Sequence, residues 1–393
     1  MDERKYIESY CTGCGLCHSV QYTKIAKDKR GFPTAVLQDD EKLSFYRNVC
    51  PVYYYDDIAK HDVWGIVKTA IVGYSSDDKL RYKAASGGAL TELCCALLSS
   101  KTVDGILQTT YDPDDQTKTI SVISRTEEEV KSRCGSRYSI SVPLEHILQS
   151  IVSCERYAFV GKPCDVMALK RYFSVRPELE RTIPYLLSFF CAGEPSEAAQ
   201  DALLNKMNCT HEECDSITYR GNGWPGYTTV VKKNGTVEKL EYKVTWGRYL
   251  GRDLRNICRF CMDGTGDCAD IVCADFWHLD ETGYTDFSEH EGRNIIIART
   301  NQGVELLNQA IRNNQIIVEE DFTSKMDEFH KYQPAQYKRK GTMKSALFSM
   351  RLFGKEIPHY SKSYLNKYGR HISPKEKLKY FIGITKRVIK GKV

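Results

Sequence analysis

The amino-acid sequence predicts an α/β protein, α+β overall, in which a small cysteine-rich domain precedes a larger α/β core with a mixed sheet. Three observations support this fold class. A tight cysteine triplet near the start of the chain is followed by one isolated Cys-Pro pair. Two strand–loop–helix units occur in the middle of the chain, and each has a cysteine just after its strand. The length of 393 residues is sufficient for two or three domains.

The composition is that of a folded protein without a secretion signal. Hydrophobic residues make up 41% of the chain and charged residues 27%. The first residues, MDERKYIESYC, are charged, so we expect no signal peptide, and no apolar run is long enough to span a membrane. We therefore expect a cytoplasmic protein whose sixteen cysteines bind metal or lie buried as free thiols, because disulfides are rare in that compartment.

Four cysteines in the segment 1–64 have the spacing of iron–sulfur ligands. Cys11, Cys14 and Cys17 form C-x2-C-x2-C, and Cys50 is followed by Pro, as the last ligand of ferredoxin motifs is. Two short strands around the turn KDKRGFP would return Cys50 to the triplet. We therefore predict a ferredoxin-like domain with one 4Fe-4S cluster. Zinc is the alternative, although zinc sites usually pair two C-x2-C knuckles.

The segment 65–150 contains a candidate site for a phosphate or a flavin. A buried strand is predicted in IVKTAIVGYSS, and Ser86, Gly87 and Gly88 then precede the apolar helix ALTELCCALL. Free N–H groups and the positive dipole end favour an anionic ligand at such a helix start. A Gly pair before a helix is often only a turn. VDGILQTT and TKTISVIS are predicted to be paired strands.

The segment 151–325 has cysteines at equivalent positions of two strand–loop–helix units. Cys164 follows the strand RYAFVG, and Cys191 follows the strand IPYLLSFF. Because ligands bind at the carboxyl edge of an open α/β sheet, the two cysteines can converge if their strands are neighbours. Cys258 and Cys261 form C-x2-C, a typical metal knuckle. We predict a second 4Fe-4S cluster bound by these four cysteines.

Other cysteines leave alternatives open. Cys268 and Cys273 could join the C-x2-C pair in a local zinc site, but DIVCADFW is typical of a buried strand in which Cys273 points inward. Cys134 and Cys268 are the reserve ligands for the second cluster. A zinc-stabilised binding protein without enzymatic activity therefore stays open as a function.

Several segments occur in the order seen in a known family. SGGALTELCCALL, VGKPCDVMALKRYF, FFCAGEPS and CRFCMDGTGDCADIVCADFW resemble motifs of the coenzyme F420 hydrogenase/dehydrogenase beta-subunit family, over roughly residues 5–310. CTGCGLC with the later Cys-Pro resembles the ferredoxin-type extension of longer bacterial members, which are often encoded among polysaccharide-biosynthesis genes. The resemblance implies a flavin- and iron–sulfur-dependent oxidoreductase.

The resemblance also implies a flavin site. The cofactor is expected to be FAD, with FMN as the alternative. The residues implied to bind it are Ser86, Gly87, Gly88, Lys162, Asp275 and Trp277. Ala274 stands where the family has Gly in its G-D-F-W motif. No pattern in the sequence identifies a catalytic acid or base.

The implied activity is an electron relay. Electrons from a ferredoxin-like or deazaflavin donor would pass through the 4Fe-4S clusters to FAD and on to an organic substrate, such as a sugar or glycan intermediate. An alternative is that the chain is the electron-transfer beta subunit of a larger hydrogenase or dehydrogenase complex. We expect no nucleic-acid partner.

The segment 326–393 is predicted to be a basic C-terminal tail. Residues 331–393 hold 17 Lys and Arg but two acids, a net charge of +15, so the first 330 residues carry −10 of the total +5. Ile384 and Val388 are among the interspersed apolar residues that we expect to insert into the anionic inner face of a membrane. The alternative is a basic helix packed by its apolar side.

Overall fold

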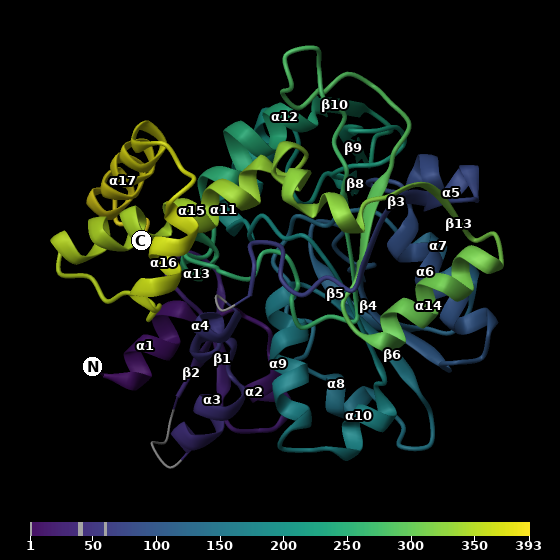
Figure 1. The fold of residues 1–393 in the computed structure, drawn as a ribbon, viewed down its shortest axis with the longest axis horizontal. Coiled ribbons are helices and arrows are strands. Elements are labelled where there is room, and N and C mark those ends of the chain that lie inside the picture. The colour runs from purple at the N-terminus through teal and green to yellow at the C-terminus, as the bar shows by residue number, and fades with distance from the viewer. Residues whose placement is uncertain (1, 38–41, 59–60) are drawn as a thin grey trace.

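The computed structural model describes residues 2–37, 42–58 and 61–393, and its core is an eight-stranded mixed sheet (Figure 1). The residues outside this description fall within the predicted segment 1–64. The strand order is β13-β3-β12-β11-β7-β6-β4-β5. The strands are β3 (Thr69–Ser75), β4 (Gly105–Tyr111), β5 (Thr119–Ser124), β6 (Tyr157–Gly161), β7 (Tyr185–Phe189), β11 (Ile271–Asp275), β12 (Asn294–Ala298) and β13 (Ile316–Asp321).

The strand directions confirm the predicted mixed sheet. The four central strands β4, β6, β7 and β11 are parallel to one another. Strand β5 at one edge and strands β12, β3 and β13 toward the other edge pair antiparallel to their neighbours. The predicted pairing of VDGILQTT with TKTISVIS is confirmed as β4 with β5, and the two cysteine-bearing units contribute the neighbouring strands β6 and β7.

Helices cover both faces of the sheet because the strands alternate apolar side chains between their two sides. On β3, Ile71 packs with α6 (Ala89–Ser99) and α14 (Asn301–Arg312), whereas Val72 packs with Phe322 and Phe329 on the opposite side. Helix α9 (Pro163–Phe173) lies with α2 (Leu16–Ser19) on that opposite side, against β6 and β7. The shorter helices near the sheet are α5 (Asp78–Lys83), α7 (Glu127–Ser132), α8 (Ile147–Ser150) and α10 (Glu178–Thr182).

The N-terminal part is small and cysteine-rich. It contains α1 (Glu3–Tyr10), the antiparallel pair β1 (Lys24–Lys27) and β2 (Pro33–Val36), α3 (Leu43–Val49), η2 (Pro51–Tyr53) and α4 (Tyr55–Ile58). The strand pair confirms the hairpin predicted around KDKRGFP. Phe32, near the end of this turn, is buried.

A second, three-stranded sheet follows β7 in the chain. It consists of β8 (Cys214–Thr218), β9 (Tyr227–Lys232) and β10 (Val237–Glu241), all antiparallel. The elements around it are α11 (Glu197–Lys206), α12 (Tyr242–Val244), η3 (Thr245–Tyr249), η4 (Leu250–Arg252) and α13 (Asn256–Arg259). After β13, η5 (Thr323–Lys331) leads into the C-terminal helices.

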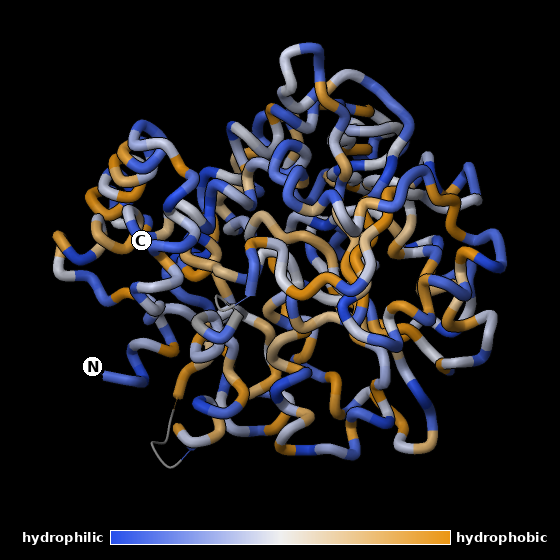
Figure 2. Tube along the Cα trace, in the orientation of Figure 1, coloured by the Kyte–Doolittle hydropathy of each residue, from blue (hydrophilic) through white to orange (hydrophobic). Residues whose placement is uncertain are grey.

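Three helices form the C-terminal part: α15 (Pro334–Leu352), α16 (Lys362–Gly369) and α17 (Pro374–Ile389). They pack beside α1, since Met343 and Leu347 of α15 share one apolar cluster with Tyr6 and Tyr10 (Figure 1). Apolar and polar segments alternate along these helices (Figure 2). No helix in the described ranges is both long and apolar enough to traverse a bilayer.

The expectation that Ile384 and Val388 insert into a membrane is wrong. Their side chains are buried, at 3% and 8% exposure, in the apolar cluster between α17 and α15. The opposite face of α17 instead exposes Leu378, Ile382 and Ile389. The helix therefore has two apolar stripes, and the stripe with Ile384 and Val388 packs against the rest of the protein.

Candidate metal sites and the adjoining cavity

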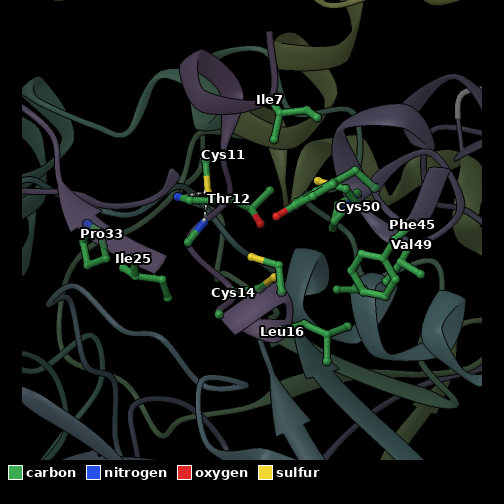
Figure 3. A pocket seen from close by; sticks show the side chains of 17 residues that line it. Ile7, Cys11, Thr12, Cys14, Leu16, Ile25, Pro33, Phe45, Val49 and Cys50 are labelled. Carbon is green, nitrogen blue, oxygen red and sulfur yellow. Dashed lines mark hydrogen bonds between the residues drawn. The ribbon is translucent and has the colours of Figure 1, made fainter. Parts of the chain in front are cut away.

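The four cysteines predicted as the first metal site line one small cavity in the N-terminal part, and we call them the first cysteine group. Cys11 and Cys14 lie on the loop between α1 and α2, Cys17 lies on α2, and Cys50 directly follows α3. Figure 3 shows Cys11, Cys14 and Cys50 around this space with apolar side chains such as Ile7. The fold thus brings the distant Cys-Pro back to the triplet.

The surroundings of the first cysteine group suit thiolates bound to iron. Burial is the largest cause that raises the pKa of the Cys17 and Cys50 thiols, and the neighbouring thiolates raise it further. A thiolate in such surroundings is therefore favoured only when a cation binds it. The backbone N–H of Gly13 donates to Cys11 Sγ at 3.4 Å, and that of Ala35 donates at 3.5 Å. Hydrogen bonds to sulfur are a feature that tunes iron–sulfur clusters.

The structure also brings together the four cysteines predicted as the second metal site, which we call the second cysteine group. Cys164 is in the first turn of α9, Cys191 lies just beyond β7, and Cys258 and Cys261 lie in and just after α13. Strands β6 and β7 are parallel neighbours, so the first two cysteines share one sheet edge. Burial and the Asp165 carboxylate are the main causes that raise the pKa of Cys164, and the Cys191 and Cys258 thiolates add to them.

The remaining thiols of the second cysteine group are equally enclosed. Burial, then the Cys258 and Cys261 thiolates, raises the pKa of Cys191 to about 12. Burial also raises the pKa of Cys261 to about 11. The backbone N–H of Glu194 donates to Cys258 Sγ at 3.4 Å. The donor set and its surroundings fit the same kind of cluster as in the first cysteine group.

The two reserve cysteines have different surroundings. Cys134 lies near Arg137, whereas Cys268 lies near Asp263 and packs against the same apolar cluster as Cys258 and Cys261. Cys273 is buried in β11. Within the described ranges, no three His, Cys, Asp or Glu side chains are close enough to share one metal ion.

The two cysteine groups are close neighbours. Helix α9 carries Cys164 in its first turn and Ala168 one turn later, and Ala168 lines the cavity of the first cysteine group. Four helical residues advance about 6 Å along the helix axis. Arg255 joins the groups, because its Nη1 donates to the Cys11 carbonyl at 3.4 Å while its charge attracts the Cys258 thiolate.

A cavity of about 630 Å³ adjoins the second cysteine group. It opens at the carboxyl ends of β6, β7 and β11, where Gly161, Phe189 and Asp275 line it. Ligands bind at this edge in open α/β sheets, and small-molecule sites typically enclose about 300–1,000 Å³. Cys191 belongs both to the second cysteine group and to the cavity wall. A cofactor in this cavity would therefore lie next to a cluster.

Five of the six residues implied to bind the flavin line this cavity. They are Ser86, Gly88, Lys162, Asp275 and Trp277. Asp275 accepts hydrogen bonds from the Arg220 guanidinium at 2.9 and 3.0 Å. The Trp277 ring stacks on Trp224, with ring centroids 4.9 Å apart. These internal contacts fix both side chains as rigid parts of the wall.

The sixth residue, Gly87, has a different environment. A Cβ at this position would lie 2.8 Å from Asn294 Oδ1 and 2.9 Å from Arg293 Cα. It would therefore crowd the start of β12, and a role of Gly87 in binding the flavin stays a prediction.

Sequence reasoning missed the buried charges between the cysteine groups and the cavity. Arg255 Nε donates to Glu194 Oε2 at 2.6 Å, and both side chains are buried. Lys162 Nζ lies 3.2 Å from Asp165 Oδ2 and 3.5 Å from Glu194 Oε1. Burial alone would raise the pKa of Glu194, but Arg255 and Lys162 hold it below its ordinary value. The proximity of Glu194 to Cys191 in the sequence was the one available signal.

Two family models match this chain. The model for the coenzyme F420 hydrogenase/dehydrogenase beta subunit N-terminus matches residues 70–149, and the model for the C-terminus of the same subunit matches residues 154–323. Together they cover the eight-stranded sheet. The first cysteine group and helices α15 to α17 lie outside both matches.

Three curated relatives share sequence similarity with the chain. The coenzyme F420 hydrogenase subunit beta of Methanococcus voltae is 26% identical, covering 63% of this chain and 82% of that protein. The chloroplastic 7-hydroxymethyl chlorophyll a reductase of Oryza sativa is 23% identical, and the alignment covers 76% of this chain and 61% of that protein. The F420-dependent formate dehydrogenase subunit beta of Methanocaldococcus jannaschii is 22% identical, and the alignment covers 56% of this chain and 57% of that protein.

A solved structure shares the fold. A chain of the F420-reducing NiFe hydrogenase complex from Methanosarcina barkeri superposes with a TM-score of 0.55 at 18% identity. The alignment covers 75% of this chain and 97% of that one. It confirms the α/β fold class predicted from the sequence.

Proposed function

The chain belongs to the coenzyme F420 hydrogenase/dehydrogenase beta-subunit family, and from this premise we propose that it carries electrons between two 4Fe-4S clusters and a cofactor in the large cavity. One observation supports this more than any other. The three sites are contiguous, because α9 contacts both cysteine groups and Cys191 belongs to both the second group and the cavity wall.

The roles of the protein's own residues follow from their positions. When bound, the clusters would exchange single electrons, and a flavin would convert these into two-electron chemistry. The cysteines would hold the irons, and the apolar lining would exclude water from the first site. The buried pair Arg255–Glu194 would hold the Cys11 loop against α13, which carries Cys258. Lys162 would place a positive charge at the cavity wall.

The cofactor proposed for the cavity is FAD, with FMN as the alternative. The volume and the position at the carboxyl edge of the sheet support a large ligand. Acid release of flavin from anaerobically purified protein tests this, and we expect about one FAD per chain. Protein with full iron content but no released flavin would contradict the flavin assignment.

We favour a role as an electron-transfer subunit that exchanges electrons with the deazaflavin coenzyme or a ferredoxin-like protein. Two of the curated relatives are named as beta subunits, one of a coenzyme F420 hydrogenase and one of an F420-dependent formate dehydrogenase. The second candidate is a stand-alone reductase of an organic substrate such as a glycan intermediate, which is supported by the similarity to the plant reductase.

Stopped-flow spectroscopy separates the electron donors. We expect reduced F420 or reduced ferredoxin to bleach the cluster absorbance of the isolated chain, without steady turnover until a partner subunit is added. Sustained turnover of an organic substrate by the isolated chain would instead support the second candidate. No bleaching by either donor would contradict the proposed relay.

A peripheral membrane contact of a cytoplasmic protein is a further part of the proposal. Leu378, Ile382 and Ile389 are exposed by 58%, 42% and 69%, and their spacing places them on one face of α17. The exposed lysines beside this stripe are Lys375, Lys379, Lys386 and Lys390. Each such cation near an anionic leaflet contributes about 1 kcal/mol, and shallow apolar insertion adds to it.

Vesicle sedimentation tests the membrane contact. We expect the protein to bind phosphatidylserine vesicles at low salt, and replacing all three stripe residues by Ser should weaken binding at least tenfold. The control replaces Ile120 by Ser, because this exposed apolar residue lies on β5 and not on α17. Equal binding of the triple variant and the control would contradict the contact.

A further inference from the structure

Helix α15 brings a buried cation to the second cysteine group. Arg339 lies on this helix, beyond residue 323, where the family match ends. It is 8% exposed. Its Nη2 donates a hydrogen bond to the carbonyl oxygen of Cys191 at 3.0 Å. The guanidinium also attracts the thiolates of Cys191, Cys258 and Cys261 electrostatically.

The charge of Arg339 is compensated differently from the charges of the neighbouring buried arginines. Arg255 pairs with Glu194 at 2.6 Å, and Arg299 lies 3.6 Å from Asp267. The hydrogen-bond partners of Arg339 within the described ranges are the Cys191 carbonyl and Gln336, both uncharged. A buried cation without a counter-charge is costly. An anionic iron–sulfur cluster held by the nearby thiolates would provide that counter-charge.

Neighbouring residues support the contact between Arg339 and the Cys191 carbonyl. Gln336 lies one turn before Arg339 on α15, and its Nε2 also donates to the Cys191 carbonyl, at 2.9 Å. A Cβ on Gly264 would lie 1.6 Å from Arg339 Nη2, so the absence of a side chain there makes the close approach possible. The helix itself is anchored, because Lys340 Nζ donates to the Val63 carbonyl at 2.6 Å.

We propose that Arg339 is a positioning residue that fixes the Cys191 segment and stabilises the reduced state of a cluster at the second cysteine group. Reduction adds one electron to the cluster, and the positive charge of the nearby guanidinium offsets the added negative charge. The C-terminal helices outside the family match would thereby set the reduction potential of that cluster. The inference rests on the proposed function, since it requires the second cluster.

Redox titration of the full chain tests the proposal. The variants are Arg339→Gln and Arg339→Lys, and Lys344→Gln is the matched control because it removes an exposed charge from the same helix. At a fixed potential, Arg339→Gln should lower the ratio of reduced to oxidised second cluster about tenfold, which corresponds to about 59 mV for a one-electron couple. Arg339→Lys should retain part of the effect. The first cluster and the control should not change.

The outcomes separate this inference from the proposed function. An unchanged ratio in Arg339→Gln with full iron content would overturn the role of Arg339 and leave the proposed function intact. Loss of second-site iron in Arg339→Gln but not in Arg339→Lys would support the electrostatic role of Arg339, because only the Lys variant keeps a positive charge at this position. Loss of that iron in both variants, with an unchanged ratio for any cluster that remains, would overturn the electrostatic role. Absence of a second cluster from the unaltered protein would instead overturn the proposed function.

Discussion

The two cysteine groups differ in how the chain assembles them. The first lies within 40 residues of sequence, and its cavity is lined mainly by apolar side chains. The second takes its members from two βα units and from α13 with the residues just after it, and the cations Arg255 and Arg339 approach it from separate elements. The first group is a local motif that a short loop can form, whereas the second exists only when the whole core is folded. The second should therefore be more sensitive to changes far from its cysteines.

The largest effect is expected from breaking the ion pair between the two groups. In Arg255→Met, Glu194 loses its closest cation and keeps Lys162 at 3.5 Å. Removing one partner of a buried pair typically costs about 3–5 kcal/mol of unfolding free energy. Urea denaturation of the apoprotein would measure the loss.

The exposed pair Arg312–Glu305 provides the control for this experiment. Both side chains are mostly exposed, so Arg312→Met should cost less than about 1 kcal/mol. Equal losses in the two variants would show that Arg255 contributes no more than a surface charge.

A matched glycine pair would distinguish the groups. Gly13 has φ of +72°, and a Cβ there would lie 2.4 Å from Arg255 Nη2. Gly193 has φ of +124°, and a Cβ there would lie 3.2 Å from the Cys258 Cβ. Each change to Ala should cost about 1–3 kcal/mol because L side chains rarely adopt these conformations.

The two glycine variants should also lose different irons. We expect Gly13→Ala to lose iron from the first group and Gly193→Ala to lose iron from the second, which electron paramagnetic resonance of the reduced proteins can resolve. Loss of the same signal in both variants would contradict the assignment of two separate groups.

The smallest effect is expected at the reserve cysteines. Cys134 lies near Arg137 in the cavity wall, and Cys268 lies near Asp263 beside the apolar cluster that Cys258 and Cys261 also contact, but neither belongs to the proposed ligand set. Cys134→Ser and Cys268→Ser should both keep the full iron content, as measured by colorimetric iron analysis. Loss of iron in either variant would show that the substituted cysteine binds iron in place of one of the proposed ligands.

Sequence reasoning succeeded where spacing along the chain determines contact in space. The hairpin between the triplet and Cys50 has a clear turn signal, and the strand-end cysteines Cys164 and Cys191 follow from the rule that parallel strands share one edge. Arg339 could not be predicted in this way, because it reaches the second group from a helix about 150 residues after Cys191 through tertiary packing.

The error on α17 has a similar cause. Both Ile384 and Ile382 satisfy the periodicity of an apolar helix face, and periodicity alone does not say which face meets the rest of the protein. In the structure, Ile384 is 3% exposed and Ile382 is 42% exposed. The packing of α17 on α15, which depends on the position of α15, decides between them.

The central claim, that two separate 4Fe-4S clusters adjoin one cofactor cavity, is tested most directly by iron analysis of a matched pair of variants. Anaerobically purified protein should contain about eight irons per chain, as two cubanes require. Cys14→Ala and Cys261→Ala should each retain about half of that iron, with complementary losses by spectroscopy. Unchanged iron in Cys261→Ala, together with a loss of zinc, would contradict the second cluster and the relay that depends on it.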